Sequence, residues 1–151
     1  MGVGLPGSGK TTVIFELSKL IPNSIIVSSD KVRLEITGDE SDQSKNQQVW
    51  DSIHKRVNEA INEHKVVFID ATYAKHIERK RDIELYRSMN ANYVIGLYIN
   101  TSFSIASERN INRDRTVPLK AMQRMAQMIK TNPPSLSDGF DKIIVLNSGL
   151  S

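Results

Sequence analysis

Cysteine is absent from this 151-residue chain, which excludes a disulfide framework and thiolate chemistry. No apolar run approaches the roughly 18 residues of a membrane-spanning helix, and no charged-then-apolar signal segment opens the chain. Because no metal-ligand spacing relates the histidines, we interpret His54, His64 and His76 as structural or surface residues. Together these absences favour a cytoplasmic enzyme.

The remaining composition is that of an ordinary globular domain, and its charge is unevenly distributed. Hydrophobic residues make up 39% and charged residues 25% of the chain, and its length predicts a single domain over 1–151. The net charge is +3, yet residues 71–130 alone hold 11 Lys and Arg against 5 Asp and Glu. This excess indicates either solvated helix faces or attraction to an anionic partner such as a nucleic acid.

The segment Gly4–Thr11 is the most informative motif, because it fits the phosphate-loop pattern G-x-x-x-x-G-K-[ST]. Its glycines let backbone N–H groups converge at the start of a helix, where they hold phosphate oxygens. In such a loop Lys10 places its charge on the β- and γ-phosphates of a nucleotide, and Thr11 offers its hydroxyl to Mg²⁺. The mechanism also requires a helix after the loop, and the apolar helical run at 13–17 supplies it.

Alternating strand and helix patterns predict an α/β fold with a five-stranded parallel sheet and helices on both faces. Apolar, β-branched runs predict the strands at Met1–Gly4, Ser24–Ser28, Val66–Asp70, Tyr93–Ile99 and Lys142–Leu146. Helical patterns lie between them, at roughly 10–20, 30–37, 46–64, 75–90, 102–112 and 118–131. Only three residues precede Gly4, so we expect either a very short first strand or residues missing upstream of Met1.

Ligands of such sheets bind beyond the carboxyl ends of the strands, and this rule selects two aspartates. Asp30 follows the second predicted strand, and its carboxylate is either a general base for an attacking hydroxyl or the N-cap of the next helix. Arg33, one helical turn later, is either a solvated or paired side chain or a fork for an acceptor phosphate. Asp70 ends a strand at the Walker-B position, where a carboxylate holds Mg²⁺ through water.

A basic cluster at Arg109, Arg113 and Arg115 precedes Pro118, which is predicted to start a new helix. Arg109 and Arg113 are four residues apart and are predicted to share a helix face. The cluster is either a mobile lid that neutralises charge on a transferring phosphoryl group or an exposed helix end. Trp50 lies in an amphipathic pattern and is predicted to pack in the core or against a loop rather than to stack on a base.

Taken together, these motifs resemble the polynucleotide 5′-kinase family of P-loop phosphotransferases. That family combines the loop, here Gly4–Thr11, with an Asp-x-x-Arg after the second strand, here Asp30–Arg33. It has a strand ending in Asp-x-Thr, here Asp70–Thr72, and a lid with two arginines four residues apart followed by Val-Pro, here Arg109–Arg113 and Val117–Pro118. The order and spacing match the kinase domain over nearly the whole chain.

The resemblance implies ATP- and Mg²⁺-dependent transfer of the γ-phosphoryl group to the 5′-hydroxyl of DNA or RNA. It implies that Lys10, Asp30 and Arg113 are catalytic, with Asp30 as the general base. The acceptor is then held by Asp30, Arg33, Asp70 and Thr72, and the metal by Thr11 and Asp70. The donor, ATP or another nucleoside triphosphate, is held by Gly7, Ser8, Gly9, Lys10, Thr11, Thr12, Arg109 and Arg113. Tyr73 departs from the pattern, because family members often carry asparagine there.

Two other functions are compatible with the same motifs. Kinases of small hydroxylated molecules, such as a nucleoside, a sugar or an antibiotic, share nearly the same core. An NTP-binding switch or an ATPase without an acceptor shares the phosphate loop. The pair formed by Asp30 and Arg33 argues against the switch, because a switch needs no base for an acceptor hydroxyl.

Overall fold

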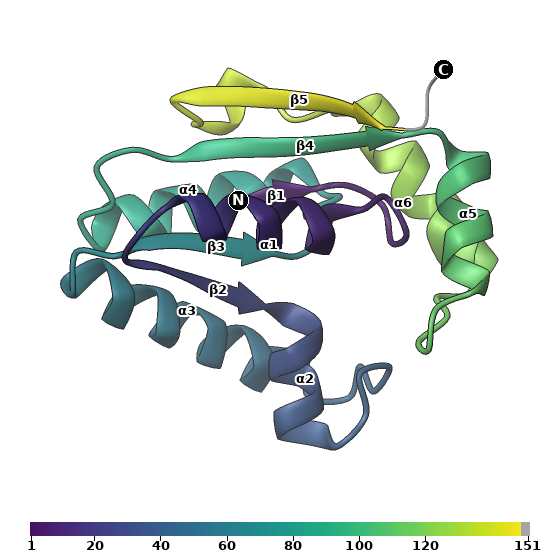
Figure 1. Ribbon diagram of the computed structural model, residues 1–151, viewed down its shortest axis with the longest axis horizontal. Helices are drawn as coiled ribbons and strands as arrows, with labels where there is room; N and C mark the ends of the chain where they lie inside the picture. The colour runs from purple at the N-terminus through teal and green to yellow at the C-terminus, as the bar shows by residue number, and fades with distance from the viewer. Residues whose placement is uncertain (149–151) are drawn as a thin grey trace.

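Strands and helices alternate along the chain in the computed structural model, which describes residues 1–148 (Figure 1). Residues 149–151 of the predicted domain lie outside the described part. The strands are β1 (Gly2–Val3), β2 (Ser24–Ser28), β3 (Val66–Asp70), β4 (Ile95–Thr101) and β5 (Lys142–Ser148). The helices are α1 (Lys10–Leu20), α2 (Ser29–Thr37), α3 (Asn46–Asn62), α4 (His76–Ser88), α5 (Phe103–Ile111), α6 (Leu119–Thr131) and the short 3₁₀ helix η1 (Leu136–Asp138).

The strands pair in parallel, as predicted, but their hydrogen bonds divide them into two sheets rather than one sheet of five. One sheet has the order β1-β4-β5, and the other contains β2 and β3. The division arises because β1 has only two residues, and both of them pair with β4. A hydrogen bond of 3.1 Å from the Gly4 N–H to the Thr72 carbonyl joins the segments just beyond β1 and β3.

The strand β4 begins two residues later and ends two residues later than the sequence predicts. It pairs residue by residue with β5, from Ile95 opposite Lys142 to Thr101 opposite Ser148. Val94 lies outside this ladder, because its N–H donates to the Asp141 carboxylate at 2.7 Å. The pairing with β5 therefore sets the ends of β4, and the hydropathy of the segment alone does not.

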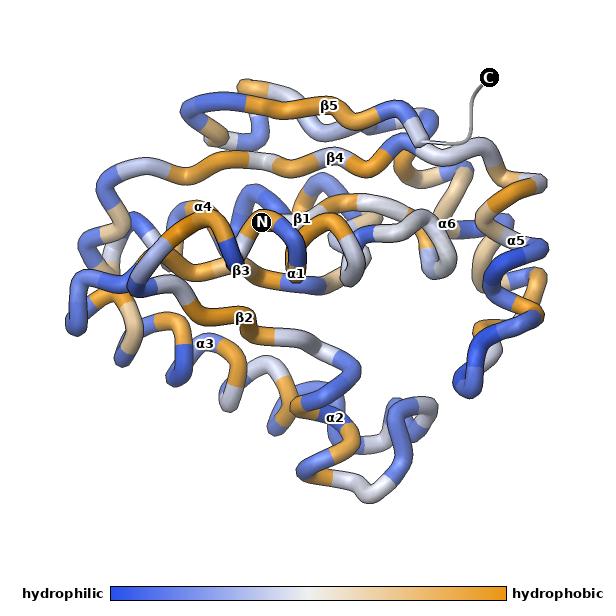
Figure 2. Tube along the Cα trace, viewed as in Figure 1, coloured by the Kyte–Doolittle hydropathy of each residue, from blue (hydrophilic) through white to orange (hydrophobic). Residues whose placement is uncertain are grey.

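Helices cover both faces of the strands, as predicted. On one face Ile14 of α1 packs against Leu97 and Ile99 of β4. On the other face Ile53 of α3 and Tyr86 of α4 belong to a cluster with apolar residues of β1, β2 and β3. Figure 1 shows α1 in front of the strands and α4 behind them, and Figure 2 shows the hydrophobic strands between more hydrophilic helices.

The carboxyl ends of the first four strands point to the same side of the molecule (Figure 1). The loops and helices that follow them therefore meet there, which is where parallel sheets of this kind bind ligands. Within residues 1–148, no helix combines the length and the apolar character needed to cross a membrane.

Candidate active site

The phosphate loop needs glycine at two positions because of its backbone conformation. Gly7 has φ 80°, and a Cβ there would lie 2.3 Å from the carbonyl oxygen of Ala106 on α5. Gly9 has φ 99° and is the N-cap of α1. The loop is also anchored from β4, because the Thr101 hydroxyl donates to the Ser8 carbonyl at 2.9 Å. This geometry holds the loop at the N-terminus of α1, where backbone N–H groups favour anions.

Lys10 is a buried cation within this loop. Its Nζ donates to the carbonyls of Gly4 and Leu5 at 2.9 Å and 3.0 Å. Burial lowers the pKa of Lys10 to about 8, and the neighbouring carboxylates of Asp70 and Asp30 partly oppose this lowering. A phosphate bound in the loop would supply a further opposite charge and would raise the pKa again.

Nucleotide affinity is therefore expected to depend on pH in the alkaline range. Below a pH of about 8 the free protein already carries Lys10 as a cation, so its charge does not change on binding. Above that pH, binding takes up a proton, and the affinity for ATP should fall by up to about tenfold per pH unit. Titration of ATP binding between about pH 7 and pH 9.5 measures the slope. A Lys10→Met variant should lack this slope, and a wild-type affinity that stays flat would contradict the assignment.

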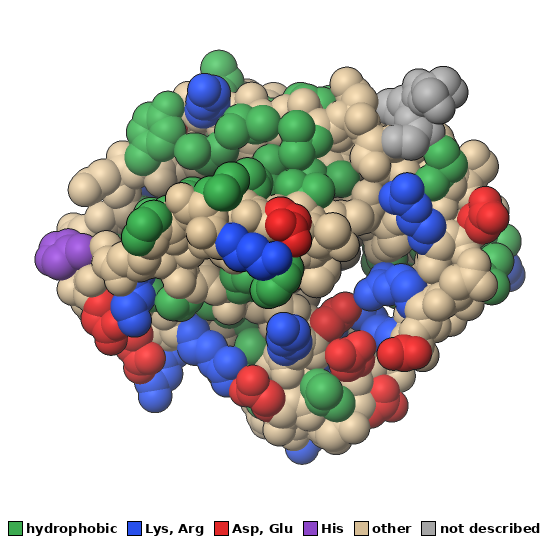
Figure 3. Space-filling view, in the orientation of Figure 1, with side chains coloured by type: hydrophobic (Ala, Val, Ile, Leu, Met, Phe, Trp, Pro, Cys, Tyr) green, Lys and Arg blue, Asp and Glu red, His purple; other side chains and the backbone are tan. Residues whose placement is uncertain are grey.

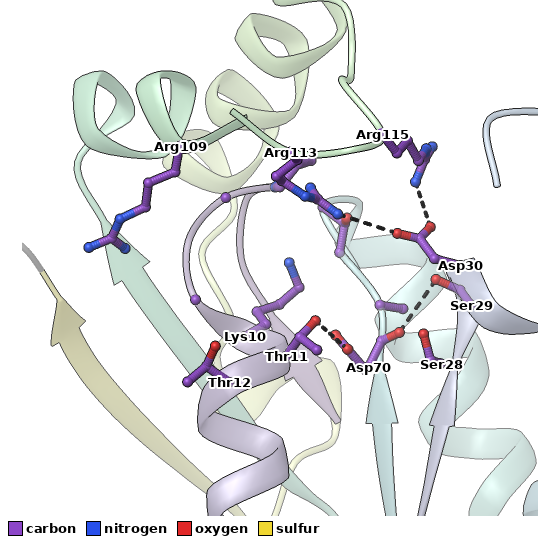
Figure 4. Close-up of a pocket in the computed structure, with 15 residues that line it drawn as sticks. Lys10, Thr11, Thr12, Ser28, Ser29, Asp30, Asp70, Arg109, Arg113 and Arg115 are labelled. Atoms are coloured by element: carbon purple, nitrogen blue, oxygen red, sulfur yellow. Dashed lines mark hydrogen bonds and ion pairs between the residues drawn. The ribbon is translucent and has the colours of Figure 1, made fainter. Parts of the chain in front are cut away.

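Thr11 and Asp70 meet at the base of the loop and offer two oxygen ligands for a metal. The Thr11 hydroxyl donates to the Asp70 carboxylate at 2.7 Å, and both residues line the same cavity (Figure 4). A hydroxyl and a carboxylate are ligands that suit Mg²⁺, which usually keeps several waters and the phosphates of its substrate. No cluster of three or more His, Cys, Asp or Glu occurs in the described part of the chain. The donor set therefore fits a metal held together with a nucleotide rather than by the protein alone.

Asp30 lies in the first turn of α2, but it does not cap that helix. The N-cap is Ser28, whose side chain accepts a hydrogen bond from the Lys31 N–H at 3.4 Å. This finding separates the two interpretations left open by the sequence, because the Asp30 carboxylate is not used to cap the helix. It is directed into the cavity beside the phosphate loop instead (Figure 4).

Three arginines surround the carboxylate of Asp30. Arg33 contacts it at 3.0 Å, Arg115 at 2.5 Å and Arg113 at 3.6 Å. Arg113 and Arg115 reach across the cavity from the segment after α5, as the dashed lines in Figure 4 show. Figure 3 shows basic and acidic side chains facing each other across a hollow in this side of the surface. Arg115 was not among the predicted site residues, and its place beside Arg113 in the basic cluster was the signal for it.

The lid differs from its prediction in one respect. Arg109 and Arg113 do not share a helix face, because α5 ends at Ile111 and Arg113 lies in the loop beyond. The buried Asn110 closes this loop, since its amide donates to the Val117 carbonyl at 2.8 Å and accepts from the Val117 N–H at 3.0 Å. Both arginines nevertheless line the cavity at the phosphate loop. Tertiary bonding to Asn110, rather than helical spacing, therefore places Arg113.

Two cavities meet at Asp30. The first, of about 270 Å³, is lined by Lys10, Thr11, Asp70 and the lid arginines. The second, of about 340 Å³, is lined by Arg33 and by residues of α3 and α6. Asp30 and Thr72 line both.

The structure brings most of the predicted site residues together at this place. Eight of them border the first cavity besides Asp30 and Thr72: Gly7, Gly9, Lys10, Thr11, Thr12, Asp70, Arg109 and Arg113. Ser8 is buried in the loop itself, and Arg33 borders the second cavity. Sequence reasoning did not predict Ser28, Ser29 and Arg115, which also line the first cavity. The chemical roles of the site residues predicted from the sequence stay predictions.

A family model described as an AAA domain matches residues 1–131, which is most of the chain. The chain belongs to this family. A search of curated protein sequences gives no match. The match agrees with the phosphate loop and with the α/β fold on which the site is built.

Comparison with solved structures supports the P-loop kinase fold. A chain of the Pnkp1/Rnl/Hen1 RNA repair complex matches with a TM-score of 0.78 and 18% identity over 93% of this chain. A sugar kinase from Janibacter sp. HTCC2649 matches with a TM-score of 0.65 and 16% identity over 97% of this chain. The shikimate kinase of Acinetobacter baumannii matches with a TM-score of 0.57 and 20% identity over 98%. The predicted enzyme class, an ATP-dependent phosphotransferase, agrees with these neighbours.

The share of each neighbour's own length that is matched differs between them. This chain spans 45% of the chain from the RNA repair complex, so it corresponds to less than half of that protein. It spans 82% of the sugar kinase and 83% of the shikimate kinase. The resemblance predicted from the sequence is thus confirmed for the fold, which is that of a P-loop kinase domain.

Proposed function

We propose that the chain is an ATP- and Mg²⁺-dependent kinase that transfers the γ-phosphoryl group to a 5′-hydroxyl end of DNA or RNA. The observation that carries the proposal is the position of Asp30 between two cavities, with Lys10 on one side and Arg33 on the other. A phosphotransferase needs a donor site and an acceptor site that meet at the base for the acceptor hydroxyl. A nucleotide switch needs only the first of these sites.

The residues of the first cavity are suited to hold and activate the donor. Loop N–H groups and Lys10 bind the β- and γ-phosphates, and Arg109 and Arg113 neutralise charge on the transferring group. Asp30 takes the proton of the acceptor hydroxyl. At the same time the hydroxyl oxygen forms a bond to the γ-phosphorus, and the bond between that phosphorus and the bridging β-phosphate oxygen breaks. Mg²⁺, held by Thr11 and Asp70, would neutralise charge on the β- and γ-oxygens.

The arginines around Asp30 also suggest an order of events. Phosphates of the donor carry more negative charge than one carboxylate and offer Arg113 a stronger partner. Donor binding therefore draws Arg113 from Asp30 toward the donor phosphates, while Arg33 and Arg115 stay in contact with the carboxylate.

Arg33 supports an anionic acceptor. Its side chain is only 7% exposed, and Asp30 is the one carboxylate within salt-bridge distance among residues 1–148. Its buried Nε–H has no hydrogen-bond partner in the described part of the chain, and a buried unused donor of this kind calls for an explanation. When Asp30 becomes protonated, Arg33 needs another anion, and a phosphate next to the attacked hydroxyl supplies one.

A kinase of a small hydroxylated molecule is the second candidate. It is favoured by the sugar kinase and the shikimate kinase, which match this chain over more than four fifths of their own length. The two candidates differ in their acceptors, because a sugar or a plain nucleoside brings no phosphate to Arg33. The cytoplasmic location stays a prediction under either candidate.

Removal of the Arg33 side chain is expected to weaken binding of the acceptor and to leave binding of the donor unchanged. The Arg33→Ala variant should raise the KM for a 3′-phosphorylated nucleotide by about 10- to 100-fold, the worth of a hydrogen bond to a charged group. The KM for a nucleoside without that phosphate should change little. The measurement is phosphate transfer to a 5′-hydroxyl oligonucleotide, a 3′-mononucleotide, a nucleoside and a sugar, at low and high salt. Oligonucleotide transfer should weaken as salt rises.

The matched control is Arg33→Lys, which keeps the charge and loses the planar fork. It should recover part of the preference for the 3′-phosphate. The wild type, Arg33→Ala and Arg33→Lys should bind ATP with similar affinity. A preference for the sugar or the nucleoside that Arg33→Ala leaves unchanged would overturn the polynucleotide assignment and favour the small-molecule kinase.

A further inference from the structure

The second cavity contains an aromatic wall. Trp50 and Tyr73 both line the cavity, and their ring centroids lie 5.6 Å apart with planes inclined by 59°. Trp50 packs against the core, as predicted, but it is only partly buried and also lines the cavity, so the stacking role that the sequence disfavoured has to be considered again. The part of its indole that the core leaves uncovered is therefore available to a ligand in the cavity.

A buried polar network fixes the position of this wall. The Tyr73 hydroxyl donates to the Asp82 carboxylate at 2.7 Å, and Asp82 has no exposed surface. The other oxygen of Asp82 lies 3.3 Å from His54 Nε2, and the His54 ring lies 5.7 Å from the Trp50 ring. Tyr73 has φ 46°, a left-handed conformation that is strained for a bulky residue and persists only where its surroundings impose it. The Tyr73 ring is thus held in one orientation before any ligand arrives, and Trp50 lies beside it.

The cavity also has an apolar contribution from α6 and the segment before it. Met125, Met128 and Val117 line it together with the aromatic residues. Methionine side chains are flexible and polarizable and make favourable contacts with aromatic rings. This part of the cavity therefore suits a planar ring better than a sugar, whose hydroxyls would each need a polar partner.

The polar lining of the cavity is mainly basic. Arg33, Lys75, Arg115 and Arg124 line it, against the two carboxylates of Asp30 and Glu78. Charge of this sign suits phosphate groups, which arginine and lysine both bind. A ligand that fills the cavity thus needs a planar ring and anionic groups on the same molecule. The volume of the cavity, about 340 Å³, falls in the range of small-molecule sites.

We infer that this cavity holds the nucleobase beside the attacked hydroxyl, stacked on Trp50, with the neighbouring phosphates on the basic side chains. The inference rests on the proposed function and adds a requirement to it: the acceptor must carry a base at its terminal residue. Trp50 then determines specificity by binding the acceptor ring, and Asp82 positions the wall through Tyr73.

The fluorescence of Trp50 tests this binding without any reaction. It is the only tryptophan of the chain, so a change in its emission reports on this wall alone. With a non-hydrolysable ATP analogue filling the first cavity, thymidine 3′-phosphate should quench the emission. The same sugar phosphate without the base should bind about 10- to 100-fold more weakly, since stacking on an aromatic side chain is worth about 1–3 kcal/mol per base.

Variants provide a second, kinetic test with matched acceptors. One oligonucleotide carries a normal 5′-terminal nucleoside, and the other has the same 5′-hydroxyl and phosphates with an abasic terminal residue. Trp50→Leu should raise the KM for the first by about 10- to 100-fold and leave the KM for the second nearly unchanged. Trp50→Phe keeps an aromatic face and should stay within about threefold of the wild type for both. Equal effects of Trp50→Leu on both oligonucleotides, or equal quenching by the two small phosphates, overturn the inference.

The two proposals fail in different ways. If no 5′-hydroxyl end is phosphorylated while thymidine 3′-phosphate still quenches Trp50 and the abasic phosphate does not, the polynucleotide kinase is wrong and the base site stands. If oligonucleotides are phosphorylated regardless of their terminal base, the kinase stands and the base site is wrong.

Discussion

Replacement of Lys10 by alanine is expected to lower the rate of phosphoryl transfer by at least about 100-fold, as the loss of one preorganised charge-stabilising donor does in other enzymes. Phosphoryl transfer depends almost entirely on positioning and charge neutralisation, and Lys10 is the lysine of the phosphate loop. The measurement is turnover of ATP with a 5′-hydroxyl oligonucleotide at saturating concentrations of both.

The fold should survive this substitution. Among residues 1–148, Lys10 Nζ bonds only to loop carbonyls at the edge of the cavity, and no buried carboxylate there loses a salt-bridge partner when it is removed. Lys19→Ala is the matched control, because Lys19 is an exposed lysine on the same helix whose partner is Glu16. It should leave turnover and stability nearly unchanged. A folded Lys10→Ala protein with wild-type turnover would refute the assignment of the phosphate loop.

Replacement of Asp30 by asparagine should remove transfer to an acceptor and preserve binding of the donor. Asparagine keeps the size of the side chain and cannot take a proton from the acceptor hydroxyl, a contribution typically worth about 100- to 10,000-fold in rate. ATP affinity should stay within about threefold of the wild type, because the loop and Lys10 supply most donor contacts. Turnover and ATP binding measured on the same preparation separate the two effects.

Two further variants are controls for this experiment. Asp51→Asn changes an exposed aspartate on α3 in the same way and should leave turnover unchanged. Ser28→Ala removes the observed N-cap of α2 and should cost about 1 kcal/mol in the free energy of unfolding. Activity of Asp30→Asn near that of the wild type would mean that this carboxylate is not the base.

Where the chemistry depends on residues close together in the chain, the sequence was sufficient. The phosphate loop could be predicted because Gly7 and Gly9 serve the conformation of their own loop, and a helix must follow it directly. Asp70 could be placed because a parallel strand delivers its last residue to the ligand-binding edge. The pairing of Asp30 with Arg33 followed from helical spacing.

Local patterns failed where a neighbour competes for the same role. Ser28 and Asp30 are both good N-cap residues two positions apart, and only the observed bond to Lys31 assigns the cap to Ser28. The spacing of Arg109 and Arg113 suits a shared helix face, yet the side chain of Asn110 bonds to Val117 and the helix ends before Arg113. In both cases a side-chain hydrogen bond distinguishes two arrangements that the local sequence allows equally.

The sequence by itself determined the nucleotide-binding half of this protein: the loop, its lysine, the strand-terminal aspartate and the alternating fold that brings them to one edge. Only the tertiary structure decided the other half. Arg115 reaches Asp30 across 85 residues of chain, and Trp50, Tyr73 and Met125 come from three segments to line one cavity. The phosphate loop is a local motif, because each of its residues is required by the conformation of the loop itself. The second cavity is built from contacts between distant segments, and their meeting depends on how the whole chain packs.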